Sequence, residues 1–329
     1  MTRKGKFLRA GLFIFLIVLV VGIHFTIGWR PFIGPRKRAV TNRQFERTPE
    51  RVARGRYLTQ GLLGCVTCHS PKNWNVHGAP SVAGMDLAGQ VLPLPDFPGS
   101  LTAPNITPDR ETGGGSWTDD EFARAIREGI GHDGRTIFPM MPYTGYKALS
   151  DEDLASVVVY LRSLPAVRNS LPPAQVNFPV NYLVRAAPQP VTEAVHGPDS
   201  KDRVATGKYL AKLGCGCHRV EEKIDFGGGE PLKGPWGEAT SANITFDPSG
   251  IGYYDEATFI NALRTGYAGA RKLNSIMPFG EFRNLGDEDL KAIYAFLRTV
   301  KPAKHRVDNT LPPTYCKVCK GKHGAGDQN

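Results

Sequence analysis

The chain contains one series of short motifs twice, in the same order. The matched segments are 53–69 with 205–218, 103–109 with 241–247, 120–130 with 257–267, 141–164 with 277–300, and 169–173 with 309–313. Local insertions and deletions separate the two copies, and the largest of them lies at 70–104. An internal repeat of this kind predicts two tandem domains built on one plan.

The repeat divides the chain into six parts. Gly and Pro number 37 and 26 among 329 residues, which favours loop-rich domains. We expect a membrane anchor at 1–30, a basic linker at 31–48, a first domain at 49–168, a Pro-rich linker at 169–200, a second domain at 201–301, and a tail with a cysteine pair at 302–329.

Each copy has the pattern of short helices, and no strand pattern is convincing. Thr118, followed three residues later by Glu121, forms a capping box that marks a helix start. The last helix of each copy carries an apolar stripe. The stripe residues are Leu154, Val157, Val158, Leu161 and Leu164, and then Leu290, Ile293, Tyr294, Leu297 and Val300. Since a few short helices bury little, an all-α fold here requires something else to fill each centre.

The most specific signal in the chain is the run Cys65-Val-Thr-Cys68-His69. It matches the attachment signal of c-type haem. Residues i and i+3 share one face of a helical turn, so both thiols can add to the vinyl groups of one porphyrin while His69 meets the iron. A zinc site would need a second ligand pair nearby, and none follows in this copy. We therefore favour haem over a disulfide.

The second copy has one residue fewer between its cysteines, Cys215 and Cys217, and His218 follows. Cys217 and His218 align with Cys68 and His69, which predicts a second haem with Cys217 as a thioether and His218 on the iron. On a helix, thiols at i and i+2 point roughly 200° apart. Cys215 is bonded only if the turn is distorted, and the neighbouring glycines would permit that. One thioether with Cys215 free is the alternative.

Two methionines occupy the same position in the repeat. Met141 and Met277 each precede a proline and lie ten residues before the acid that opens the last helix. A methionine thioether is the usual second axial ligand in cytochromes of this kind, and it raises the reduction potential. We expect Met141 and Met277 to be these ligands. Met140 is the alternative in the first copy.

Residues 50–165 and 201–300 each resemble a class I c-type cytochrome domain. The phrases "NIT", "FARAIREG", "MPY" and "SDEDLASVVVYLRSLP" are similar to those of the cytochrome c subunits of membrane-bound alcohol, aldehyde and gluconate dehydrogenases and of related dihaem cytochromes. The resemblance implies helices wrapped on haem, with the first and last helices crossing. It also implies electron transfer without catalysis by this subunit. Those subunits commonly carry three haems, whereas this chain has motifs for two.

The N-terminal arm holds most of the positive charge. The chain has a net charge of +10, and residues 1–48 contain ten Lys or Arg and one Glu. The two domains are near neutral, so nucleic-acid binding is not expected. Residues 10–29 are uncharged and long enough to span a bilayer. A cleaved signal peptide is the alternative, but no good cleavage site follows, and we favour an anchor that contacts membrane lipid.

Several residues remain outside these motifs. Cys316 and Cys319 precede a lysine rather than a histidine, which disfavours a third haem. A zinc site with His323 would lack a fourth ligand within the tail, so a disulfide is the simpler interpretation. Four histidines without a counterpart in the other copy are expected at the surface, namely His77, His132, His196 and His305. Asn105 and Asn243 could approach a propionate or hold a loop.

The sequence therefore predicts a membrane-anchored dihaem cytochrome that passes single electrons between redox partner proteins, within a respiratory or photosynthetic chain. Haem is attached to c-type cytochromes outside the cytoplasm. We expect a single pass through a bacterial inner membrane, with both haem domains in the periplasm. One alternative is a haem enzyme, either a dihaem peroxidase or a thiosulfate-oxidising cytochrome. Another is a haem-carrying subunit of a larger membrane complex.

Overall fold

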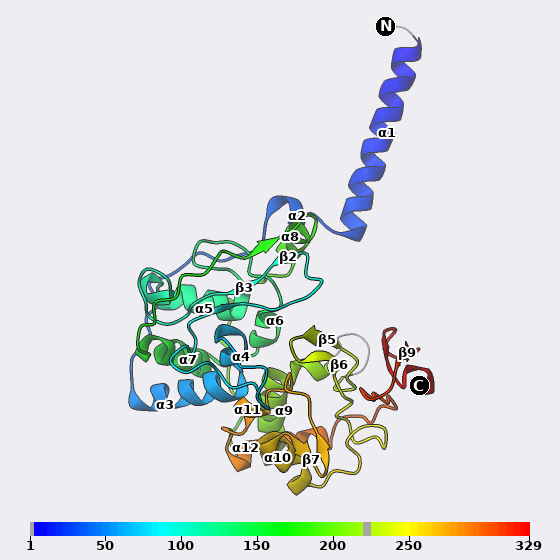
Figure 1. Cartoon of the computed structure of the whole chain (residues 1–329). Helices are drawn as coiled ribbons and strands as arrows, with labels where there is room; N and C mark the ends of the chain where they lie inside the picture. Colours follow the sequence, from blue (N-terminus) through cyan, green and yellow to red (C-terminus); the bar gives the residue numbers. More distant parts are fainter. Residues whose placement is uncertain (1–2, 220–224) are drawn as a thin grey trace.

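The computed structural model describes residues 3–219 and 225–329. Helix α1 (Arg3–Thr26) projects from the body of the molecule (Figure 1). Its stretch Arg9–Thr26 is long and apolar enough to cross a membrane, and it is not covered by the rest of the chain. A signal sequence near the N-terminus would have the same properties, so the helix is compatible with both an anchor and a signal.

The fold is mostly helical, and the helices recur in the same order in the two repeats. The first repeat contains α3 (Pro49–Tyr57), η1 (Leu58–Leu62), α4 (Cys65–His69), η2 (Gly114–Ser116), α5 (Asp119–Glu128), α6 (Tyr143–Tyr146) and α7 (Asp151–Ser163). The second contains α9 (Arg203–Gly214), η4 (Gly216–His218), α10 (Glu256–Thr265), α11 (Phe279–Phe282) and α12 (Asp287–Leu297). The expected six-part division of the chain stays a prediction.

In each repeat the first helix packs directly against the last, and a glycine lies at the contact. A Cβ on Gly55 of α3 would lie 1.9 Å from the Ser156 carbonyl oxygen of α7. A Cβ on Gly207 of α9 would lie 1.8 Å from the Ala292 carbonyl oxygen of α12. The absence of a side chain at these two positions allows the helix backbones to approach closely. The crossing that the family resemblance implied is confirmed.

The helix starts follow the caps in the sequence. Thr118 and Glu121 form the expected capping box at α5, with the Thr118 hydroxyl accepting from the Glu121 amide. Ser150 caps α7, and Asp255 caps α10 through their side chains. The apolar stripes of α7 and α12 are buried except at their C-terminal ends, where Leu164 and Val300 are half-buried. These stripes turn both helices toward the core.

Short strands that the sequence did not indicate pair within and between the loops. In the described residues they form five antiparallel two-stranded ribbons, β1–β3, β2–β4, β5–β6, β7–β8 and β9–β10. The strands are β1 (Gln90–Val91), β2 (Gly99–Ser100), β3 (Thr102–Ala103), β4 (Gln175–Val176), β5 (Pro231–Gly234), β6 (Gly237–Thr240), β7 (Tyr267–Ala268), β8 (Arg271–Lys272), β9 (Pro313–Tyr315) and β10 (Lys322–Gly324). Segments of two to four residues are too short to show an alternating pattern, so the all-α prediction was incomplete.

The two linkers lie on the surface of the first repeat. The first includes α2 (Arg30–Ile33), and the second includes α8 (Val180–Leu183) and η3 (Val184–Ala186). Within the first linker, Arg38 contacts Asp120 at 2.6 Å and Glu128 at 2.7 Å, both on α5. The Thr41 amide also donates to Asp120. The basic linker is therefore a strap that is fastened to α5.

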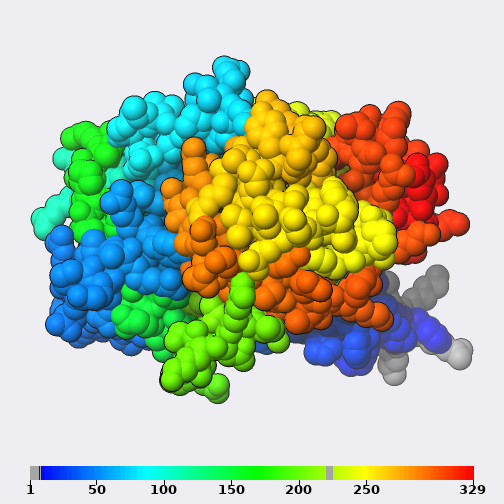
Figure 2. Space-filling model, turned by 90° about the horizontal axis from the view of Figure 1, so that it is seen from below, coloured from blue at the N-terminus to red at the C-terminus, as the bar shows by residue number. Residues whose placement is uncertain are grey.

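The two repeats share one continuous apolar core and a reciprocal pair of contacts. Tyr57, at the end of α3, donates to Asp289 at the start of α12 over 2.5 Å. Its counterpart Tyr209 on α9 donates to Asp153 at the start of α7 over 2.8 Å. Each repeat thus holds the start of the other repeat's last helix, as expected for a local two-fold relation. Figure 2 shows the repeats side by side, with the C-terminal tail against the second.

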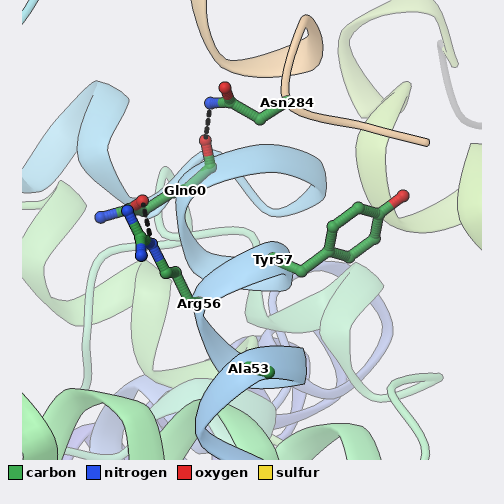
Figure 3. Close-up of a pocket in the computed structure, with 5 residues that line it drawn as sticks. All are labelled: Ala53, Arg56, Tyr57, Gln60 and Asn284. Carbon is green, nitrogen blue, oxygen red and sulfur yellow. Dashed lines mark hydrogen bonds between the residues drawn. The ribbon is translucent and has the colours of Figure 1, made fainter.

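Beside this reciprocal pair, Lys72 and Glu281 form a buried ion pair across the junction, with 2.5 Å between Nζ and Oε1. A shallow hollow of about 250 Å³ opens nearby, lined by Ala53, Arg56, Tyr57, Gln60 and Asn284 (Figure 3). The Asn284 side-chain amide donates to the Gln60 carbonyl oxygen there. None of the cysteines, histidines or methionines singled out by sequence lines this hollow, which is a surface feature of the junction.

Candidate haem sites

The first motif lies on the short helix α4, directly after the left-handed residue Gly64. Cys65 and Cys68 are one helical turn apart, which places both thiols on the same side, as the sequence predicted. Burial raises the pKa of Cys65 to about 12 and that of Cys68 to about 11. Burial therefore favours the neutral thiol form of both cysteines.

His69 is buried beside these thiols and has a defined orientation. Its Nδ1 lies 2.8 Å from the Pro104 carbonyl oxygen. A carbonyl only accepts, so Nδ1 carries the proton and Nε2 presents a lone pair. Burial lowers the pKa of His69, which keeps the ring neutral. The Gly89 amide donates to the His69 carbonyl oxygen over 2.6 Å and fixes the backbone.

The second motif reproduces the histidine geometry. His218 Nδ1 lies 2.7 Å from the Ala242 carbonyl oxygen, and Ala242 occupies the position that Pro104 has in the first repeat. Burial likewise lowers the pKa of His218. The Gly228 amide donates to the His218 carbonyl oxygen over 3.0 Å. Both imidazoles therefore present Nε2 as a ligand atom.

The shortened cysteine spacing is accommodated by a change of helix type. Cys215 is the residue directly after α9, and the next three residues form the tighter 3-10 turn η4. Burial raises the pKa of Cys215 to about 12. Cys217 lies at the rim and is exposed, but burial of its thiol still raises its pKa. Both cysteines lie within three residues of His218. Whether the second haem has one thioether bond or two stays open.

The expected role of the flanking glycines is partly wrong. Neither Gly214 nor Gly216 has a positive φ, so the turn does not use the conformational freedom of glycine. Gly216 has nothing within 4 Å of a Cβ. Gly214 is needed for packing instead, because a Cβ would lie 2.9 Å from Leu62 Cδ1 in the first repeat. The two repeats approach so closely here that position 214 has no room for a side chain.

The two Met-Pro turns have the same backbone geometry. Pro142 and Pro278 have φ of −80° each and ψ of 42° and 50°. Met141 and Met277 are half-buried and pack against the apolar core. Met140 is 41% exposed, which supports Met141 as the inward residue of the pair. Met141 and Met277 therefore have matching, partly buried positions.

The asparagines hold a loop in both repeats. The Asn105 side chain donates to the Val167 carbonyl oxygen over 2.7 Å, and Asn243 donates to Ala303 over the same distance. Each asparagine oxygen accepts from the amide of the threonine two residues later. These bonds tie the chain leaving the last helix to the loop that orients the histidine. Between the two interpretations of these asparagines, this geometry supports the loop.

The two motifs lie close to each other across the junction. Tyr146 is buried near both, and its hydroxyl donates to the Leu63 carbonyl oxygen over 2.7 Å. Its pKa is raised by burial and further by the nearby thiols, among which are Cys68 and Cys217 from different repeats. Thiols of both motifs therefore lie near the same tyrosine.

Comparison with known proteins agrees with this geometry. A model of the cytochrome c family matches residues 52–165, which include the first motif and its methionine. Residues 52–165 form a domain of the cytochrome c family. The second repeat of this cytochrome lies outside the matched range, but its histidine, asparagine and methionine repeat the arrangement of the first. The donor groups of both motifs fit covalently attached haem c, with thiols for the vinyl groups and Nε2 for the iron.

Relatives of this cytochrome include subunits of dehydrogenases. It is 30% identical to the gluconate 2-dehydrogenase cytochrome c subunit of Pantoea cypripedii, over 76% of this chain and 59% of that one. It is 25% identical to the cytochrome c subunit of a quinone alcohol dehydrogenase of Gluconobacter oxydans, over 76% and 54%. The chain thus spans little more than half of these relatives. It is 28% identical to a dihaem cytochrome of Cereibacter sphaeroides, over 72% and 82%.

The remaining histidines and cysteines give a mixed outcome. His132 and His196 are exposed as expected, and His77 is half-buried against Phe279. His305 is fully buried, so the prediction of a surface position is wrong. No disulfide joins Cys316 and Cys319, although the spacing favoured one.

Proposed function

We propose that this cytochrome carries two covalently attached haems and transfers single electrons as a subunit of a membrane-bound dehydrogenase complex. The ligands proposed for the first haem are Cys65, Cys68, His69 and Met141. Those for the second are Cys217, His218 and Met277, with Cys215 as a second thioether. The observation that carries this proposal is the shared geometry of the two repeats, in which a carbonyl-oriented histidine and a Met-Pro turn occupy matching places.

A bound haem supplies one-electron chemistry between ferric and ferrous iron. The chain's own residues set the conditions for it. The carbonyl groups of Pro104 and Ala242 fix the proton of each imidazole on Nδ1, so that Nε2 faces the iron. The thioethers of Met141 and Met277 would be the further iron ligands, and a thioether ligand would favour the ferrous state and raise the potential. If Met141 and Met277 both bound iron, neither haem would have an open position for a substrate, which would argue against a haem peroxidase.

The proximity of the motifs supports electron exchange between the haems inside one molecule. Gly214, next to Cys215, packs against Leu62 of the first repeat, and thiols of both motifs lie near Tyr146. The buried Lys72–Glu281 pair holds the repeats together beside them. We propose that one haem accepts the electron and the other passes it to a partner.

We further propose that α1 is an uncleaved anchor in a bacterial inner membrane and that the haem domains face the periplasm. Its support is the uncharged length of the helix and its projection from the body. The named dehydrogenase subunits among the relatives support a membrane complex as the working assembly. Substrate oxidation then belongs to another subunit, and this chain is an electron carrier.

The test uses the full chain, matured with haem and purified from membranes in mild detergent. We expect an intact mass with two haems and the near-infrared charge-transfer band of methionine-bound ferric haem, integrating to two sites. A dehydrogenase subunit should co-purify and reduce both haems when its substrate is added.

A single haem would overturn the dihaem proposal, and a high-spin ferric haem would favour an enzyme. Recovery without α1 in the soluble fraction would overturn the anchor.

A further inference from the structure

The C-terminal tail and the segment that leaves α12 bring four metal-binding side chains together. They are His305, Cys316, Cys319 and His323, and none is more than 2% exposed. One ligand atom from each side chain lies within 4.8 Å of all the others. The sequence placed only three of these residues near one another, and the fold supplies His305 as the fourth.

The two histidines face each other in an arrangement that suits two ligands of one cation. His305 Nδ1 lies 2.7 Å from the Gly227 carbonyl oxygen, and His323 Nδ1 lies 3.0 Å from that of Gly324. Both Nδ1 atoms therefore carry protons, and both Nε2 atoms present lone pairs. These Nε2 atoms are only 3.1 Å apart. Two lone pairs at this distance repel unless a proton or a metal ion lies between them.

The cysteines lie on a tight turn between two paired strands. Strands β9 and β10 form an antiparallel hairpin, and the Cys316 amide donates to the Gly321 carbonyl oxygen across its end. Lys320 closes the turn with a φ of 58°. A Cys-x-x-Cys pair on such a hairpin, completed by two histidines, is a ligand set typical of structural zinc.

The loop beside the cluster leaves no space for a side chain. Gly229 has a φ of 107°, and a Cβ there would lie 3.0 Å from Cys319 Cβ and 3.1 Å from His305 Cε1. The pocket is therefore closed on that side by backbone alone. A closed four-ligand set without room for substrate indicates a structural site and not a catalytic one.

We propose that His305, Cys316, Cys319 and His323 bind one zinc ion in tetrahedral coordination. Both cysteines lose their protons as the two zinc–sulfur bonds form, and the histidines bind through Nε2. Two thiolates and one dication leave the site uncharged, which suits its complete burial. Two imidazoles with two thiolates suit zinc better than magnesium or calcium, which prefer oxygen ligands. This proposal does not rest on the number of haems or on the redox partner.

The site has a structural consequence for the second haem motif. His305 is bonded to Gly227, and the next residue, Gly228, donates to the His218 carbonyl oxygen. A zinc ion would therefore fasten the tail to the loop that supports His218. The four proposed zinc ligands are not among the proposed haem ligands. Zinc content and haem content can therefore be measured independently.

The experiment measures zinc and iron by mass spectrometry in the haem-loaded full chain. We expect one zinc per chain in addition to the haem iron. X-ray absorption at the zinc edge should give two sulfur ligands at about 2.3 Å and two nitrogen ligands at about 2.0–2.1 Å. This measurement needs no variant, so it remains decisive if a substitution prevents folding. Protein without zinc that also fails to bind added zinc when reduced would overturn the proposal.

Variants assign the ligands. His305→Gln and Cys316→Ser should each lose the zinc, while the haem content stays that of the parent by intact mass and pyridine haemochrome. His196→Gln, at an exposed histidine, is the matched control and should retain it. A tail isolated with a Cys316–Cys319 disulfide, seen as a mass lower by two hydrogen atoms, would show that the cysteines are redox partners and contradict the zinc site.

Discussion

Individual residues show how one histidine geometry is built twice from different sequences. Pro104 and Ala242 share no side-chain chemistry, but each offers only its carbonyl oxygen to the histidine, at 2.8 and 2.7 Å. The loop that presents this carbonyl is held by Asn105 or Asn243. Each asparagine therefore orients a histidine indirectly, by holding the loop whose carbonyl group contacts the imidazole. Loss of either side-chain amide would release that loop.

The methionines give the first prediction. Met141→Ala and Met277→Ala should each retain both haems and lower the potential of one haem by on the order of 0.1 V, a fraction of the range of about 0.8 V that axial ligands cover. The reason is loss of the thioether that favours ferrous iron. A redox titration followed by visible absorbance measures the shift. Met140→Ala, at a residue that is 41% exposed, is the control and should titrate like the parent.

The cysteines of the second motif give another. Cys217→Ala should lose most of the second haem, whereas Cys215→Ala should keep it, because only Cys217 retains the register of Cys68 beside the histidine. Intact mass counts the haems, and the pyridine haemochrome band shifts when a vinyl group is left unsaturated. Cys65→Ala provides the comparison at a motif of ordinary spacing. The reverse result, with retention in the Cys217 variant, would mean that the alignment of the repeats is wrong.

At the scale of elements, the sequence predicted the helices well and the ribbons poorly. Caps such as Thr118 and the stripe on α7 act within one turn or one face, so they can be recognised locally. The partner of a two-residue strand such as β1 lies in β3, across a loop, and no periodicity marks it. The requirement for Gly55 and Gly207 was also invisible, since it arises from the backbone of another helix.

The helix crossings can be tested through those glycines. Gly55→Ala and Gly207→Ala should each lower the free energy of unfolding by about 1–3 kcal/mol, because a methyl group overlaps a carbonyl of the facing helix. Denaturant unfolding followed by circular dichroism measures the change. Gly145→Ala is the control, because its nearest atom lies 4.0 Å from the added carbon. Equal stability of all three variants would show that the crossing helices separate at little cost.

At the scale of the whole molecule, the repeat predicted two similar halves but not how they meet. Tyr57 and Tyr209 occupy matched positions, and each reaches the last helix of the opposite half. Sequence comparison within one chain aligns such residues, but it cannot show that their partners are exchanged. The tail is a similar case, because the ligand count that disfavoured zinc considered the tail alone and His305 was expected at the surface.

The junction supplies the last prediction. Tyr57→Phe and Tyr209→Phe should each cost about 1–2 kcal/mol of stability, because Asp289 or Asp153 loses a half-buried donor. The double variant should unfold in two separate steps, one for each half, when the parent unfolds in one. Calorimetry resolves the steps. Tyr182→Phe, on the second linker, is the control. A single step in the double variant would mean that the shared apolar core alone couples the halves.

The basic linker, residues 31–48, limits how far the two repeats can move relative to α1. Packing of the chain against the body resumes at α2, where Arg185 donates to the Pro31 carbonyl oxygen. Only residues 27–29 separate α2 from α1. A link of three residues reaches about 10–11 Å at full extension. With α1 held in a bilayer, the body cannot sweep through the surrounding volume as a cytochrome on a long flexible tether does. If the proposed anchor is correct, the body stays close to the membrane surface, and its redox partners must reach it there.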